Sequence, residues 1–138
     1  MLAEENKALT RRYYEDVWNK GNTALLDDVM VANHVNHAPP NPVLGVEGFK
    51  DYVAVYHKAF PDFHLSIEDQ VAEEDRVADR WVVRGTHQGN LMGIPPTGKQ
   101  VMVTGISITR IANGKIQETW ADFDLLGLMQ QIGVVPKM

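Results

Sequence analysis

Two carboxylates follow a tryptophan near the end of the chain, and their surroundings suit acid–base chemistry. In the segment 114–133, Trp120 precedes Asp122 and Asp124 among mostly apolar neighbours. Burial disfavours the charged form of a carboxylate and raises its pKa, which makes it a stronger base near neutral pH. This pattern indicates an enzyme that moves a proton with an aspartate and needs no cofactor.

Composition limits the alternatives. The 138 residues, 44% hydrophobic and 22% charged, predict one globular domain over 1–138. A net charge of −5 with scattered Lys and Arg argues against nucleic acid as a partner. The absence of cysteine excludes disulfides, thiol nucleophiles and thiolate metal sites. The polar start of the sequence and the absence of long apolar runs predict a cytoplasmic protein without a membrane partner.

Helical periodicity is confined to the first half of the chain. The spacing of Leu9, Tyr13 and Val17 predicts a helix over 4–19, ended by Gly21. Thr23 is expected to cap a second, shorter helix. Three prolines make the segment 34–44 irregular or a short edge strand. A third helix is expected over 47–60, stopped by a proline.

The second half of the sequence reads as strands. Alternation begins at about residue 63, and further strands are expected over 76–87, 101–111 and 115–123. Asn113 and Gly114 make the strongest hairpin signal in the chain. Helices followed by antiparallel strands predict an α+β fold with the helices on one side of a curved sheet.

The register of that hairpin decides where Asp124 points. A turn that includes Ala112 and a glycine bulge would place Ile106, Ile108 and Trp120 on one face and the polar side chains on the other. We prefer it to a two-residue turn that pairs residue 111 with residue 116, because it separates apolar from polar groups. Trp120 and Asp124 then both face inward.

The neighbouring strand offers two partners for that carboxylate. One parity groups Val77, Trp81, Val83 and His87, so that His87 lies inward at the strand end and could meet Asp124. The reverse parity makes Arg80 the inward cation, which would lower the carboxylate pKa instead.

Several motifs together resemble a known family. Residues 59–62 (AFPD), 85–89 (GTHQG), 93–98 (GIPPTG) and the stretch from Trp120 to Asp124, followed by Gly127 and 131–133 (QIG), are similar to the SnoaL-like polyketide cyclases, also called ester cyclases. The resemblance covers nearly the whole chain. It implies the cone-shaped, cystatin-like fold of nuclear transport factor two, in which helices and a bent antiparallel sheet enclose a pocket, commonly in a homodimer.

The resemblance also implies a reaction. The family's cyclases close a ring by an intramolecular aldol step, with an aspartate as acid and base and without metal or other cofactor. Asp124 is the position similar to that aspartate, and the substrate implied is a small hydrophobic carbonyl compound. His87 or His37 would be its hydrogen-bonding partner, and Trp120 would shape the cavity.

Each candidate also has a structural interpretation. Asp124 stands where a helix begins and could be its N-cap. His37 could line the pocket mouth or be a surface residue, and the spacing of His34 and His37 in an extended segment argues against a metal pair. The aromatic candidates are expected first as core and second as pocket lining: Tyr14, Trp18, Tyr56, Trp81 and Trp120.

Two other functions stay open. A non-catalytic binding protein of the same fold would use Asp124 only as a cap. An isomerase-like or epoxide hydrolase-like activity would need a polar group beside the aspartate, which for epoxide hydrolysis would hold a water.

Overall fold

The N-terminal third is helical, as the periodicity predicts. The computed structural model describes residues 2–136. Helix α1 (Leu2–Tyr13) runs directly into the π-helical segment η1 (Tyr14–Asn19), and Gly21 follows with a φ of +74°. The predicted helix over 4–19 is confirmed, with a wider last turn that carries Tyr14 and Trp18.

The second helix is shorter than expected and is not capped by Thr23. A 3-10 turn, η2 (Thr23–Leu25), leads into the single-turn helix α2 (Leu26–Val29). Asn22 occupies the N-cap position of η2, and no side chain there accepts an amide hydrogen bond. Burial of the apolar residues Leu25, Leu26 and Val29 therefore holds this turn in place.

The segment around the prolines is more regular than expected. Strand β1 (Met30–His37) ends just before them, and the short strand β2 (Val43–Leu44) pairs with it. β1 is an inner strand of the sheet, which corrects the expectation for residues 34–37, whereas β2 is a short edge strand, the second alternative expected for the segment 34–44. Helix α3 (Gly45–Ala59) follows, close to the predicted bounds.

Four long strands complete the sheet: β3 (His64–Glu73), β4 (Arg76–Thr86), β5 (Gln100–Ala112) and β6 (Lys115–Phe123). The strand order is β2-β1-β6-β5-β4-β3. β1 runs parallel to β6, whereas all other pairs are antiparallel, so the sheet is mixed and not purely antiparallel as expected.

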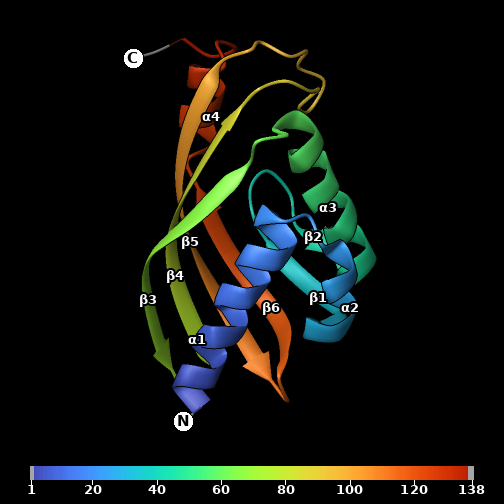
Figure 1. Ribbon diagram of the computed structural model, residues 1–138, viewed down its shortest axis with the longest axis vertical. Helices are drawn as coiled ribbons and strands as arrows, with labels where there is room; N and C mark the ends of the chain where they lie inside the picture. Colours follow the sequence, from blue (N-terminus) through green and yellow to red (C-terminus); the bar gives the residue numbers. More distant parts are fainter. Residues whose placement is uncertain (1, 137–138) are drawn as a thin grey trace.

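Helices and sheet enclose the core between them. Helices α1, α2 and α3 lie along one face of the curved sheet, and helix α4 (Leu125–Gln131) lies beside one end of it, against β5 (Figure 1). This arrangement confirms the predicted α+β architecture. Within residues 2–136, no helix is long and apolar enough to cross a membrane. The cytoplasmic location stays a prediction.

The hairpin of β5 and β6 combines the two registers between which the sequence left a choice. Asn113 and Gly114 form a two-residue turn with φ values of +54° and +70°, and Ile111 pairs with Ile116, so the expected turn with Ala112 and a glycine bulge is wrong. A register shift next to this pair then brings Thr119 opposite Thr109 and Trp120 opposite Ile108. Beyond the shift, the preferred grouping of Ile106, Ile108 and Trp120 on one face is confirmed.

The inward and outward faces of β5 are, however, the reverse of those expected. Ser107 and Thr109 are buried on the helix-covered face, whereas Ile106 and Ile108 are 50% and 39% exposed on the other. The physical reason is that the covered face borders a cavity that needs small polar groups, as described below. Of the two parities left open for β4, the structure has the one that turns Val77 and Trp81 inward, since Trp81 is buried and Arg80 is exposed.

Candidate functional site

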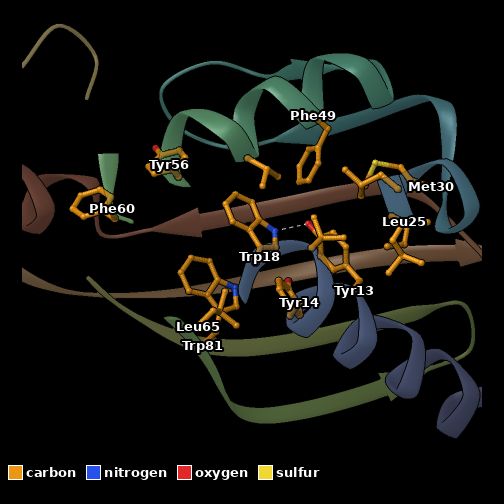
Figure 2. Close-up of a cluster of buried hydrophobic side chains, with 14 of the residues drawn as sticks. Tyr13, Tyr14, Trp18, Leu25, Met30, Phe49, Tyr56, Phe60, Leu65 and Trp81 are labelled. Carbon is orange, nitrogen blue, oxygen red and sulfur yellow. Dashed lines mark hydrogen bonds between the residues drawn. The ribbon is translucent and has the colours of Figure 1, made fainter. Parts of the chain in front are cut away.

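A cavity of about 90 Å³ lies between the helices and the sheet, enough for several water molecules. Trp18 comes from η1 and Phe49 from α3, and both point toward the strands in Figure 2. The cavity is bounded by Tyr13, Tyr14, Trp18, Asn36, Phe49, Tyr52, Tyr56, Phe60, Phe63, Leu65, Trp81, Val83, Val101, Val103, Ser107, Thr119, Ala121, Phe123 and Leu128. More than half of these residues are aromatic, so the wall is mainly apolar and presents flat ring surfaces to whatever enters the cavity.

Trp18 is the centre of the aromatic wall. Its ring stacks on Phe63 with centroids 5.3 Å apart and meets the edges of Phe49 and Tyr52 at 6.0 and 5.9 Å. Its indole N–H donates to the hydroxyl of Tyr13 at 2.9 Å (Figure 2). These contacts fix the ring, because a buried indole N–H without an acceptor would cost free energy. The pocket-lining role expected of Tyr14, Trp18 and Tyr56 agrees with this geometry.

Polar groups reach the cavity from three adjacent strands and from η1. Asn36 of β1, Thr119 of β6 and Ser107 of β5 border it, together with the phenol of Tyr14. The indole N–H of Trp81 donates to Ser107 Oγ at 2.9 Å. A ligand that enters the cavity therefore meets amide and hydroxyl groups on the sheet side, in an otherwise apolar space.

Trp81 needs a glycine as its neighbour on β5. A Cβ atom at Gly105 would lie 2.3 Å from the Trp81 ring, so the indole lies directly over this position. The absent side chain makes room for Trp81 and leaves the space above it open. The tryptophan thereby forms the sheet-side wall of the cavity.

His34 is buried behind this polar edge. Its Nε2 lies 3.0 Å from Thr119 Oγ1, and its ring meets the edge of Phe49. Burial lowers the pKa of His34 to about 4, with the charge of Glu118 acting in the opposite direction. The imidazole is therefore neutral at pH 7 and holds Thr119 in place on the cavity wall.

A buried carboxyl was missed in the sequence. Asp79 is fully buried on the helix-covered face of β4, directly opposite Ser107. Burial raises its pKa, while Gln70, Thr10 and the charge of Arg11 act against that shift. The inward position of Asp79 could have been predicted, because in an extended strand it lies on the same face as Val77 and Trp81.

Trp120 and His37 lie on the outer face of the sheet, away from the cavity. Their rings stack with centroids 5.5 Å apart, and His37 Nε2 lies 2.6 Å from Glu118 Oε2. The guanidinium of Arg76 sits 5.2 Å from the Trp120 ring centroid. The hydrogen bond to His37 is the main cause that lowers the pKa of Glu118, and Arg110 adds to it. The expectations that Trp120 faces inward and that His37 lines the pocket mouth are wrong.

Asp124 is the N-cap of α4. The backbone N–H of Gly127 donates to Asp124 Oδ1 at 2.8 Å, and the side chain is exposed. A Cβ atom at Gly127 would lie 2.1 Å from Oδ2, so the cap depends on this glycine. The inward orientation expected from the hairpin register is wrong, because Thr119, Ala121 and Phe123 occupy the inner positions of β6. Asp124 nevertheless stands between two cavity residues, Phe123 and Leu128.

His87 and Arg80 do not meet Asp124. His87 is fully buried, and its Nδ1 accepts from the backbone N–H of Thr97 at 3.3 Å and lies 3.0 Å from its hydroxyl. It thus anchors the loop after β4. Arg80 binds Asp69 on the outer face at 2.6 Å. Among the described residues, no three His, Asp or Glu side chains gather in a way that could hold a metal ion.

Comparisons with known proteins agree on one family. The sequence model of the SnoaL-like polyketide cyclases matches residues 8–132. The aklanonic acid methyl ester cyclase DnrD of Streptomyces peucetius is 34% identical over 135 residues, which cover 91% of this chain and 88% of the relative.

Solved structures give the same result. A protein from Jannaschia sp. CCS1, provisionally named a SnoaL-like polyketide cyclase, superposes with a TM-score of 0.90 at 25% identity, over 98% of this chain and 96% of its own. AclR of Streptomyces galilaeus, provisionally named a hydroxylase, gives a TM-score of 0.86 at 31% identity, over 99% and 85%. The match over 125 of 138 residues, the relative's identity and the shared fold lead to one conclusion: this chain belongs to the SnoaL-like polyketide cyclase family.

Proposed function

We propose that this chain is an ester cyclase-type enzyme that closes a ring in a small, flat carbonyl compound by an intramolecular aldol step, without a cofactor. The aromatic cavity is the observation that carries the proposal, together with the ester cyclase DnrD among the relatives. Ring closure by a flexible side chain gains from a rigid cavity, because the cavity holds the two reacting carbons in the orientation that the intramolecular step needs.

Proton transfer is assigned to Asp124. One of its oxygens, Oδ1, caps α4, and among the described residues no hydrogen bond reaches Oδ2. The carboxylate can therefore keep the helix start in place with one oxygen and accept a proton with the other. Phe123 and Leu128, on either side of it in the sequence, border the cavity. A proton flanked by two carbonyl groups is acidic enough for such a base, because the substrate spreads the negative charge over its own oxygens.

The substrate test follows from the relative's name. Aklanonic acid methyl ester is incubated with the purified protein, and the products are separated by chromatography and weighed by mass spectrometry. An aldol ring closure rearranges bonds without loss or gain of atoms, so we expect a new peak of unchanged mass that forms faster than in buffer. Ester that binds in the cavity and stays unconverted would count against the enzyme assignment.

A second function is favoured by one observation. None of the residues that border the cavity is an Asp, Glu, His, Lys or Arg, and Asp124 is exposed. A protein that only binds a flat, apolar compound needs no acid or base in its cavity. Tight binding of the ester without conversion would support this function.

We also propose that the protein is a homodimer that pairs through the outer face of the sheet. Met102, Ile106 and Ile108 expose apolar side chains there. Light scattering should give twice the 15.5 kDa mass of the chain. Ile106→Lys should halve that mass with an unchanged circular dichroism spectrum, because a lysine on this face would bring two like charges into the interface. A wild-type mass of one chain would contradict the proposal.

A further inference from the structure

Three side chains that can form hydrogen bonds border the cavity together: Trp81, Ser107 and Tyr14. Trp81 Nε1 lies 2.9 Å from Ser107 Oγ, and an indole nitrogen can only donate. Ser107 is therefore the acceptor in this bond, and its own hydroxyl hydrogen is free for another partner. Both residues border the cavity.

Tyr14 borders the same cavity. Its side chain comes from η1 and is 4% exposed. Burial is the main cause that raises its pKa, and Asp79 adds to that effect wherever its carboxyl is ionised. The phenol therefore stays protonated. Its hydroxyl hydrogen, like that of Ser107, is available to a ligand in the cavity.

Asp79 lies behind these hydroxyl groups. It is opposite Ser107 on the neighbouring strand, and within the described residues neither of its oxygens has a hydrogen-bond partner of normal geometry, since the nearby Gln70 and Thr10 donate to other groups. The groups that act on it come from three sides: Gln70 on β3, Tyr13 and Tyr14 at the end of the N-terminal helix, and Thr10 with Arg11 on α1. A buried carboxyl without hydrogen bonds is disfavoured in its charged form. A neutral Asp79 adds no negative charge beside the cavity.

We propose that Tyr14 and Ser107, backed by a neutral Asp79, form a hydrogen-bond donor site that holds a ligand oxygen as it gains negative charge. Fixed donors in a site without bulk water stabilise such an oxygen strongly, and a carboxyl kept neutral by burial does not repel it. In the proposed ring closure, the C–H proton goes to the base and the charge goes to the carbonyl oxygen. That oxygen would receive the Tyr14 hydrogen bond. After the C–C bond forms, the proton returns to the new alkoxide.

The donor site rests on the proposed function only for the identity of its substrate. Binding of a simple phenol can therefore test the donor site without turnover. The probe is 4-nitrophenol, whose two ionisation states absorb at different wavelengths, and nitrobenzene is its control because it lacks the hydroxyl group. We expect the wild-type protein to bind 4-nitrophenol with a larger ionised fraction than in buffer. Tyr14→Phe should weaken phenolate binding roughly 10- to 100-fold, the loss of one hydrogen bond to a charged group, and leave nitrobenzene binding unchanged.

Other outcomes of the binding experiment would overturn the site. The first is that bound 4-nitrophenol is less ionised than in buffer. The second is that Tyr14→Phe weakens the binding of both probes by the same factor. The third is that 4-nitrophenol does not bind at all. The result is independent of turnover. If the ester is not converted but the phenolate binds as expected, the proposed enzyme fails and the donor site stands.

The state of Asp79 has its own measurement. Because burial raises its pKa, the folded protein binds more protons than the unfolded chain above pH 3.8, the ordinary aspartate value. The free energy of unfolding of the wild type should therefore fall, relative to Asp79→Asn, as the pH rises from 3.8 toward neutrality. Denaturant titrations of both proteins across this range give the comparison. Two parallel curves, or a wild type that gains stability with pH, would show that Asp79 is charged and overturn its part of the proposal.

Discussion

Asp124→Asn is expected to lower turnover of the cognate ester at least about 100-fold while the protein stays as stable as the wild type. General acid–base catalysis contributes roughly 10²- to 10⁴-fold, and an amide cannot accept the substrate proton. Asparagine is as good an N-cap as aspartate, so the bond from the Gly127 amide to the side-chain oxygen is retained. Steady-state kinetics and denaturant unfolding measure the two effects separately.

Asp124→Ala is the matched control for the cap. It removes the base and the cap together, so turnover should fall as in the asparagine variant, and the free energy of unfolding should fall by roughly 0.5–2 kcal/mol. If the asparagine variant keeps its turnover and only the alanine variant is impaired, Asp124 is a cap alone. Because the Asp124 side chain is exposed, neither substitution disturbs core packing, so the two variants separate loss of the base from loss of the cap.

Phe49→Ala is expected to have the largest effect on stability. The ring is 2% exposed and contacts the rings of Tyr13, Trp18, His34 and Tyr52. Loss of a buried phenylalanine side chain costs about 3–5 kcal/mol, because the neighbours fill the space only in part. Denaturant unfolding of the variant should show a loss of this size.

Val55→Ala provides the comparison on the same helix. Val55 is 46% exposed on α3, so its truncation should change the free energy of unfolding by less than about 0.5 kcal/mol. A Phe49→Ala loss as small as that of Val55→Ala would mean that the aromatic wall contributes little to stability. The interpretation of Phe49 as a closely packed part of the aromatic wall would then be wrong.

Much of the fold could be predicted because local signals agreed with tertiary packing. Helix α3 follows the four- and three-residue spacing of Phe49, Val53 and Tyr56, and all three are buried. The hairpin turn at Asn113 and Gly114 was equally clear, since both residues adopt the positive φ that this turn requires.

The site could not be placed from the same patterns, because separating apolar from polar residues assumes a dry core and a wet exterior. Here the covered face of β5 carries Ser107, which borders the cavity, and Thr109, and its outer face carries Ile106 and Ile108. Both faces break the assumption, so the grouping of side chains was predicted correctly but the wrong face was taken as inward, and Asp124 with it. The motif resemblance identified the family correctly, since it depends on residue types and order and not on the direction of side chains.

β1 shows a related limit. The prolines at 39, 40 and 42 end a strand, but they say little about the residues before them. Pairing of Asn36 and His37 with β6 makes this segment regular, and such long-range pairing leaves no local trace. The sequence therefore contains no indication that His34 and Asn36 lie on the cavity side of the sheet.

The central claim is that the cavity converts a flat carbonyl ester and does not merely hold it. A single-turnover experiment tests this most directly, with protein in excess over the methyl ester, because it separates chemistry from product release. Quenching of tryptophan fluorescence would report binding beside Trp18 and Trp81, and rapid chemical quenching would report the product. We predict quenching followed by a product of unchanged mass, formed faster than in buffer. Quenching with no product after many hours would contradict the claim and leave a binding protein.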